Sequence, residues 1–213
     1  MTMKLTTTTN VTVDGVMQGL GGPDEDRSGG FERGGWALPL VDAEAGEYLD
    51  DVYGRASAFL FGRWTYESFA GSWGTFHDPS SSPIAAALNG RPKYVVSTTL
   101  TDAAWGPVTV LDGDVASAIR RLKADQDGEL VVPGSATLVR WLLAHELVDQ
   151  VDLSIYPIVL GQGARLFPEH GPDIALELLS SRTTSRGITI QSYRPAGRPD
   201  YEKRTLHPET VSW

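Results

Sequence analysis

The stretch VVPGSATLVRWLL, residues 131–143, places a Pro-Gly-Ser corner between an apolar run and a pattern with helical spacing. This corner predicts a strand that turns directly into a helix. The first amides of a helix have no partner within it, and together with the helix dipole they attract anions. Because Gly134 would let a pyrophosphate approach the backbone, a dinucleotide is one ligand that could sit here. The alternative is an ordinary turn in which Gly134 bends the chain and Ser135 caps the helix.

A second strand is predicted to break at Gly62, within FGRWTYES at 61–68. Arg63 places a fixed cation at this turn, and Thr65 supplies a hydroxyl near the start of a short helix. That pair suits a phosphomonoester such as a 2′-phosphate. The alternative is an exposed arginine beside a capping threonine.

A third strand end carries the hydroxyls of Ser97, Thr98 and Thr99. They could contact the ribose or phosphate of an adenosine, or they could form a polar loop. Ligands of open α/β sheets bind beyond the carboxyl ends of the strands. Phosphate-compatible groups at three strand ends therefore strengthen the case for one shared nucleotide site.

The elements that must position these residues alternate along the chain. Strands are predicted at 4–13, 57–61, 93–97, 108–111, 130–132 and 151–159, followed by an antiparallel pair at 175–179 and 187–193. Helices are predicted at 42–53 and 65–70, after Asp114 and after Ser135, with one helical turn at 84–88. This order predicts an α/β fold with a mostly parallel central sheet, flanking helices and a C-terminal antiparallel hairpin. We expect one domain over 1–194 and an extended tail over 195–213.

Composition narrows the classes of partner. The 213 residues carry a formal net charge of −9, which argues against nucleic acid and favours a small molecule. There is no cysteine and no apolar stretch long enough to span a membrane, so a cytoplasmic protein without membrane contact is expected. The four histidines lack the spacing of metal ligands, so no metal site is predicted.

A substrate pocket is expected between the glycine-rich loop 15–35, the helix at 42–53 and the loop at 71–89. The glycine-rich loop is long enough to be functional, and we expect it to be mobile. Trp36 and Trp73 are candidate surfaces on which a flat heterocycle could stack. For each tryptophan the alternative is core packing or the anchoring of a loop.

Five segments resemble, in order, those of the dihydrofolate reductase-like fold. The resemblance covers roughly residues 4–194 and is strongest to the reductase domain of riboflavin-biosynthesis deaminase-reductases and its stand-alone bacterial relatives. The matching segments are TVDG (12–15), GGWALP (34–39), FLFGRWTYE (59–67), RPKYVVSTTL (91–100) and VVPGSATLVRWLLAHELVDQVDLSIYPIVLGQGARLF (131–167).

This resemblance implies a reductase that uses NADPH, a cofactor that supplies the reactivity while the protein supplies orientation. It implies that the pyrophosphate is held by Gly134, Ser135 and Ala136, and that residues 13–19 lie along the nicotinamide. The side of the adenosine 2′-phosphate would be held by Gly62, Arg63, Thr65, Ser97 and Thr98.

Asp14 matches the aspartate of the family's S-x-D-G motif, with Thr12 in place of the serine. It is the candidate catalytic and substrate-binding carboxylate. The alternative is a residue that only forms the turn.

One departure bears on the substrate. Dihydrofolate reductases place a carboxylate two residues after the proline of Trp-x-Leu-Pro, whereas counting from Pro39 reaches Val41. Asp42 lies one position later, which on a helix is about 100° of rotation, so it should point elsewhere.

The leading reaction is then that of a 5-amino-6-(5-phosphoribosylamino)uracil reductase. The alternatives are dihydrofolate reductase-like activity and a non-catalytic nucleotide- or ligand-binding protein. The resemblance also suggests a homodimer, with the strand at 151–159 as a contributor.

Overall fold

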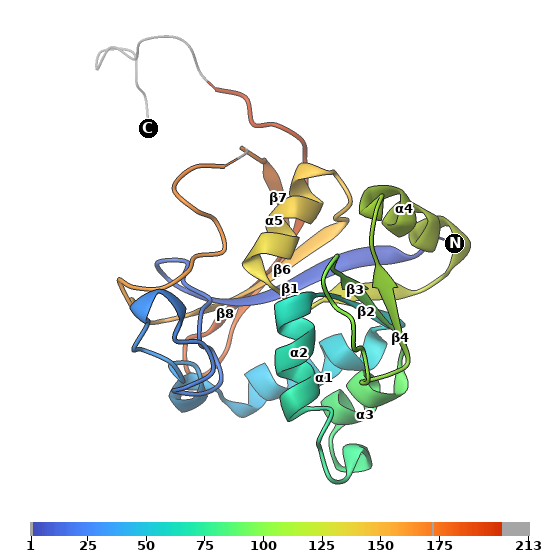
Figure 1. The fold of residues 1–213 in the computed structure, drawn as a ribbon. Coiled ribbons are helices and arrows are strands. Elements are labelled where there is room, and N and C mark those ends of the chain that lie inside the picture. Colours follow the sequence, from blue (N-terminus) through green and yellow to red (C-terminus); the bar gives the residue numbers. More distant parts are fainter. Residues whose placement is uncertain (1, 172, 202–213) are drawn as a thin grey trace.

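The computed structural model describes residues 2–171 and 173–201 and arranges them around one eight-stranded sheet (Figure 1). The strand order is β4-β3-β2-β5-β1-β6-β8-β7. All pairings from β4 to β6 are parallel, and those of β8 with β6 and with β7 are antiparallel. The predicted α/β class and C-terminal hairpin are therefore confirmed. The strands are β1 (Lys4–Thr12), β2 (Ala58–Gly62), β3 (Lys93–Val96), β4 (Val108–Leu111), β5 (Glu129–Val132), β6 (Gln150–Tyr156), β7 (Leu176–Thr183) and β8 (Thr189–Pro195).

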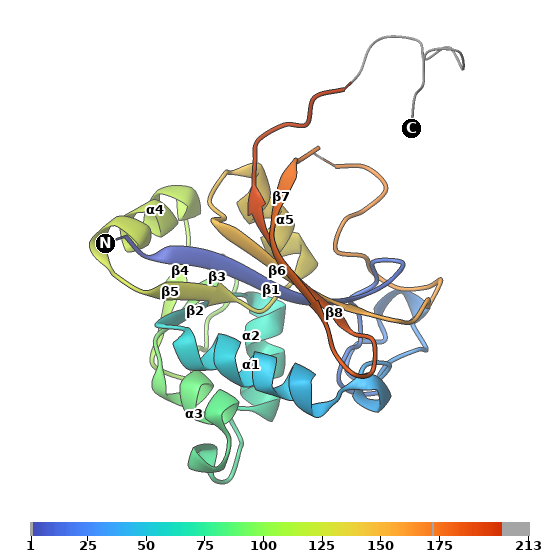
Figure 2. The same ribbon diagram turned by 180° about the vertical axis from the view of Figure 1, so that it is seen from behind.

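Five α-helices in the described residues cover the two faces of the sheet (Figures 1 and 2). Leu138 of α5 and Ile119 of α4 pack with Leu5 and Leu130 on one face, in the largest apolar cluster. The side chains of α1, α2 and α3 pack against Phe59 and other residues on the opposite face. The helices are α1 (Ala43–Arg55), α2 (Arg63–Ser72), α3 (Pro83–Gly90), α4 (Val115–Asp125) and α5 (Ala136–Ala144).

Helix α3 is longer than the single turn expected at 84–88. Ser82 accepts a hydrogen bond from the amide of Ala85 at 3.3 Å, and Pro83 occupies the first helical position, where its missing N–H costs nothing. Leu88 is fully buried on the inner side of the helix. The cap and the proline were visible in the sequence, but the surrounding Ser and Pro residues favoured a loop.

The C-terminal elements differ from expectation in their ends and in their exposure. The strand predicted at 151–159 ends at Tyr156 because Pro157 follows, and it pairs with both β1 and β8. A strand inside the sheet has no free edge for a second subunit, so it could contribute to a dimer only through its side chains, and that contribution stays a prediction. The edge on that side belongs to β7. The boundary expected at 194 stays a prediction, and residues 202–213 of the expected tail lie outside the described part.

A buried ionic cluster fastens α1 to the centre of the sheet. The Arg55 guanidinium lies 2.8 Å from Glu129 Oε2 on β5 and 3.1 Å from Asp152 Oδ2 on β6. The side chain of Asp152 is 1% exposed and that of Glu129 is 12% exposed, whereas Arg55 reaches 39%. Glu129 also accepts a hydrogen bond from Thr6, and Asp152 accepts one from Gln150. One cation therefore compensates two carboxylates that have little contact with water.

Candidate functional site

A cavity of about 430 Å³ lies beyond the ends of β5 and β2 and beside the middle of β1, three neighbouring parallel strands. The glycine-rich loop closes one side and helix α1 contributes to another. This position is the one that ligands occupy in open α/β sheets. The lining residues are Thr8, Thr9, Asn10, Met17, Gln18, Gly19, Leu20, Glu25, Asp26, Ser28, Leu49, Tyr53, Trp64, Thr65, Ser68, Phe69, Pro133, Gly134, Ser135, Ala136, Thr137 and Ala164.

The corner between β5 and α5 forms one wall of this cavity. Gly134 has φ +100°, a conformation that residues with a Cβ rarely adopt, and a Cβ there would lie 3.4 Å from the Cε of Met17. Ser135 occupies the N-cap position, but its side chain makes no capping hydrogen bond. The first-turn amides of α5 are therefore not capped by this side chain, and the corner keeps the donors that an anion would need.

The second predicted corner lies directly against the first. A Cβ built on Gly62 would be 3.6 Å from Ser135 Oγ, so the turns that end β2 and β5 touch. Thr65 lines the cavity, whereas Gly62 and Arg63 lie outside its lining. The Arg63 guanidinium is 3.5 Å from Glu67 Oε1, and about half of its side chain is exposed.

The predicted hydroxyl group after β3, formed by Ser97, Thr98 and Thr99, also lies outside the cavity lining. Ser97 Oγ accepts hydrogen bonds from the amides of Thr99 and Leu100, at 3.1 and 2.9 Å, and Thr98 is exposed. Because β3 is paired with β2, these hydroxyls follow the strand next to the Arg63 turn. The three strand ends are thus adjacent, as predicted, although only two of them contribute lining residues.

Asp14 does not line the cavity and serves the turn after β1 instead. Its two carboxylate oxygens accept hydrogen bonds from the amides of Leu160 and Gly161, at 3.1 and 2.8 Å, and from Thr12 Oγ1 at 2.6 Å. Arg165 donates to its carbonyl oxygen. Burial opposes the ionisation of Asp14, but these hydrogen bonds outweigh it and lower its pKa from 3.8 to about 2.

Replacing Asp14 with alanine is therefore expected to lower the free energy of unfolding by about 1 to 2 kcal/mol at pH 7. A carboxyl group with a lowered pKa stabilises the fold above its unfolded pKa. The deficit of the variant should accordingly shrink as the pH falls from about 4 toward 2. Urea unfolding at several pH values measures this. A pH-independent deficit, or a loss confined to ligand binding, would contradict the structural role.

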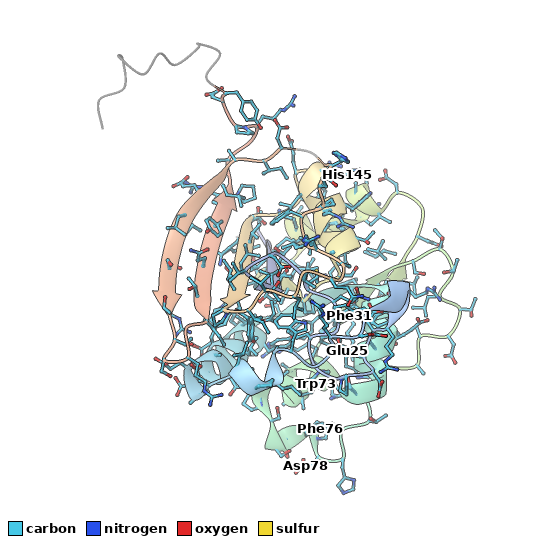
Figure 3. All side chains as sticks on the ribbon, turned by 90° about the vertical axis from the view of Figure 1, so that its left-hand side faces the viewer. Glu25, Phe31, Trp73, Phe76, Asp78 and His145 are labelled. Atoms are coloured by element: carbon cyan, nitrogen blue, oxygen red, sulfur yellow. The ribbon has the colours of Figure 1, made fainter. Side chains whose placement is uncertain are left out.

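The two predicted stacking tryptophans also lie outside the cavity lining. Trp36 is 7% exposed, donates from Nε1 to the carbonyl of Gln18 at 2.8 Å, and packs edge-to-face on Tyr156. Trp73 stacks on Phe76, and both are labelled in Figure 3. No residue of the predicted loop wall at 71–89 is among those that line the cavity. Helix α2 forms that wall in its place.

The glycine-rich loop is anchored by buried side chains of its own. Gln18, 8% exposed, donates to the carbonyl of Ser28 at 3.0 Å and accepts from the amide of Ala164 at 2.9 Å. Phe31 is 2% exposed and fills the space beneath the loop. Hydrogen bonds and packing hold this segment against the cavity, although it contains no strand or α-helix.

The sequence reasoning missed the polar residues of β1 that face the ligand space. Thr8, Thr9 and Asn10 line the cavity, and the hydroxyl of Thr9 is buried without a hydrogen-bond partner. A buried polar group without a partner costs free energy, which a bound ligand could offset. One sequence feature could have revealed these residues. They form a run of polar side chains in a strand that is paired on both sides, where apolar side chains are usual.

The described residues contain neither a cluster of metal-binding side chains nor a helix that could span a membrane. Within 2–171 and 173–201, no group of three or more histidine, aspartate or glutamate side chains could hold a metal ion. No helix in the same residues has the length and apolar character that a bilayer crossing needs.

Comparison with known proteins agrees with this architecture. The family model described as the RibD C-terminal domain matches residues 3–190. The Bacillus subtilis (strain 168) protein YyaP, whose name states no activity, is 26% identical over 183 residues, which span 84% of this chain and 87% of that protein.

Two solved structures share the fold at low sequence identity. A Thermotoga maritima diaminohydroxyphosphoribosylaminopyrimidine deaminase/5-amino-6-(5-phosphoribosylamino)uracil reductase superposes with a TM-score of 0.62 at 12% identity, covering 92% of this chain and 57% of that one. Enterococcus faecalis dihydrofolate reductase, in complex with NADP(H), gives a TM-score of 0.58 at 15% identity over 92% and 99% of the two chains. These matches confirm the dihydrofolate reductase-like fold.

Proposed function

Because this chain belongs to the RibD C-terminal domain family, we propose that it is an NADPH-dependent reductase of a small heterocyclic substrate. The observation that carries the proposal is the cavity beyond the ends of β5 and β2 and beside β1, with the start of α5, uncapped by Ser135, in its wall. Reduction of the ribosyl group of a ribosylaminopyrimidine is the leading specific reaction. A nicotinamide cofactor supplies the hydride, and the protein supplies binding and orientation.

The residues of the cavity fit such a cofactor. Gly134, Ser135 and Ala136 would hold the pyrophosphate, because amide donors and a glycine without a Cβ meet there. The partnerless hydroxyl of Thr9 would find an acceptor or donor in the bound molecule. Met17, in the segment predicted to lie along the nicotinamide, lines the same cavity as the Gly134 corner.

The adenosine end would extend past the cavity along the adjacent strand ends. Arg63 would pair with the 2′-phosphate, supported by Gly62 and by the lining hydroxyl of Thr65. The hydroxyls of Ser97 and Thr98 follow β3, the next strand of the sheet. This arrangement supports NADPH over NADH, because only NADPH carries the 2′-phosphate.

The contacts of Asp42 favour this reaction over folate reduction. Asp42 caps α1 by accepting from the amide of Ala45 at 2.9 Å, and its other oxygen accepts from the amide of Arg186 at 2.9 Å. It does not line the cavity. No carboxylate of α1 is among the residues that line the cavity, and a pterin would need one there. A non-catalytic ligand-binding protein remains the alternative from another class, and turnover of NADPH distinguishes the two.

Titration of the protein with NADPH and with NADH, followed by quenching of its six tryptophans, tests the cofactor assignment. We expect NADPH to bind at least tenfold more tightly, the effect of roughly 1.4 kcal/mol from one charged contact. Oxidation of NADPH in the presence of a ribosylaminopyrimidine, read at the nicotinamide absorbance, tests the reaction. Absence of binding by either nucleotide would overturn the proposal.

We also propose a homodimer, formed through the exposed edge strand β7. Leu176, Leu178 and Leu179 are 36%, 53% and 46% exposed on this strand, which among the described residues pairs with β8 alone. Unpaired edges that carry apolar side chains favour association. Sedimentation should give twice the chain mass of 23.0 kDa, and a clean monomer would contradict the dimer.

A further inference from the structure

Every charged side chain that lines the cavity is a carboxylate. Glu25 and Asp26 lie in the glycine-rich loop, and the lining residues include no lysine, arginine or histidine. The other polar groups of the lining are neutral hydroxyls and amides. A phosphomonoester carries about −1.5 to −2 charges at pH 7, and proteins hold it with cations or with several amide donors. The cavity lining therefore contains no cation that could bind a phosphate group of the substrate.

Two neighbouring cations are paired with carboxylates outside the lining. The exposed Arg33 of the same loop does not line the cavity either. Arg27 lies 3.0 Å from Asp24, and Arg165 lies 3.6 Å from Asp14. Arg63 follows β2, where the proposed function uses it for the cofactor. The amide donors at the start of α5 are likewise assigned to the pyrophosphate, so neither group is left to hold a second phosphate inside the cavity lining.

The two carboxylates are held at the cavity by the backbone of their own loop. Glu25 Oε2 accepts from the amide of Gly22 at 3.1 Å, and Asp26 Oδ1 accepts from the amide of Ser28 at 2.9 Å. Burial opposes the ionisation of Asp26, but hydrogen bonds from Ser28 and Gln18 outweigh it and lower its pKa. The lowered pKa keeps Asp26 ionised, and a carboxylate at this place repels an approaching phosphate.

The remaining lining defines the shape of what can enter. Leu49 and Tyr53 from α1 and Leu20 from the loop give apolar surfaces, and Thr8 and Asn10 of β1 give neutral hydrogen-bonding groups. Apolar walls with a few neutral polar groups suit a flat heterocycle with polar edges. On the basis of the proposed function, we propose that the substrate is a phosphate-free ribosylaminopyrimidine-like compound and that Glu25 and Asp26 exclude its phosphorylated counterpart.

Two matched compounds test this inference: 5-amino-6-(5-phosphoribosylamino)uracil and the same molecule with a free 5′-hydroxyl. Each is titrated calorimetrically into the protein, with and without saturating NADPH. We expect the phosphate-free compound to bind at least about tenfold more tightly, the effect of roughly 1.4 kcal/mol of repulsion. Equal or tighter binding of the phosphorylated compound would overturn the inference, as would failure of both compounds to bind at millimolar concentration.

A variant without the two charges tests whether Glu25 and Asp26 cause the preference for the phosphate-free compound. In E25Q/D26N the side chains keep oxygen acceptors for their amide donors but lose both charges, so we expect the preference to fall to about threefold or less. E32Q removes an exposed carboxylate of the same loop that does not line the cavity, and it should leave the preference unchanged. An unchanged preference in E25Q/D26N would overturn the assignment to these two residues.

The failure of this inference is distinguishable from failure of the proposed function. Binding of NADPH together with a preference for the phosphorylated compound would leave the reductase assignment standing and remove the inference. Binding of the phosphate-free compound without any binding of NADPH would support the inference about the cavity and remove the reductase assignment.

Discussion

Replacement of Arg63 with alanine is expected to weaken NADPH binding by roughly 10- to 100-fold while changing NADH affinity less than about twofold. The reason is that a hydrogen bond to a charged group contributes about 1.5 to 3 kcal/mol, and only NADPH presents the 2′-phosphate. Arg63 begins α2, and its guanidinium lies 3.5 Å from Glu67, its one ion-pair partner in the described part of the chain. About half of its side chain is exposed. Fluorescence titration of both nucleotides measures the ratio.

The matched control is Arg120→Ala, which removes one exposed arginine from α4, away from the cavity lining. It should leave both affinities unchanged and so separates a local contact from the change in net charge. Equal weakening of NADPH and NADH by Arg63→Ala would contradict the assignment of the 2′-phosphate to this corner. Measurement at two salt concentrations strengthens the comparison, since a direct phosphate contact weakens as salt rises.

Replacement of Arg55 with methionine is expected to lower the free energy of unfolding by about 3 to 5 kcal/mol. This variant keeps much of the side-chain volume but leaves Glu129 and Asp152 without their shared cation. Removing one partner from a buried ion pair has this cost because the other charge stays away from water. Urea unfolding followed by circular dichroism measures the loss, which is a large part of the stability of a typical domain.

Arg121→Met serves as the control for this change, because Arg121 is exposed on α4 and forms no ion pair with a described residue. Its effect should stay within about 0.5 kcal/mol, as for most surface substitutions. A loss below about 1 kcal/mol in the Arg55 variant would show that water already compensates the two carboxylates. The triple variant with Asn and Gln in place of the acids should recover part of the stability.

The strand-to-helix corners could be predicted because their signals are local. Pro133 to Ser135 and Gly62 to Thr65 are short breaks between patterns of different period, so each fixes a turn without reference to distant residues. The adjacency of the two corners followed from the general rule that the ends of parallel strands meet. The cap of α4 by Asp114, which accepts from the amide of Ser117, was predictable for the same local reason.

The turn role of Asp14 and the anchoring role of Trp36 were open as alternatives in the sequence, but their partners could not be predicted, because those partners are distant along the chain. Asp14 binds amides about 146 residues away, and Trp36 packs against Tyr156 across the hairpin side of the sheet. Side-chain type and local spacing do not contain that information. The polar residues of β1 were visible but were interpreted only through β propensity, which describes how a strand packs and not what it faces.

The anchoring of the glycine-rich loop also determines when this site can form during folding. β1 lies between β5 and β6, and Gln18 binds the amide of Ala164, so the earliest segment of the chain needs partners more than 120 residues later. Contacts of such high sequence separation pay a large loop-closure entropy before they gain any stability, and they form slowly. On the ribosome, β1 must therefore wait for nearly the whole domain to be synthesised. A nucleotide can stabilise only the finished fold and cannot assist its early intermediates.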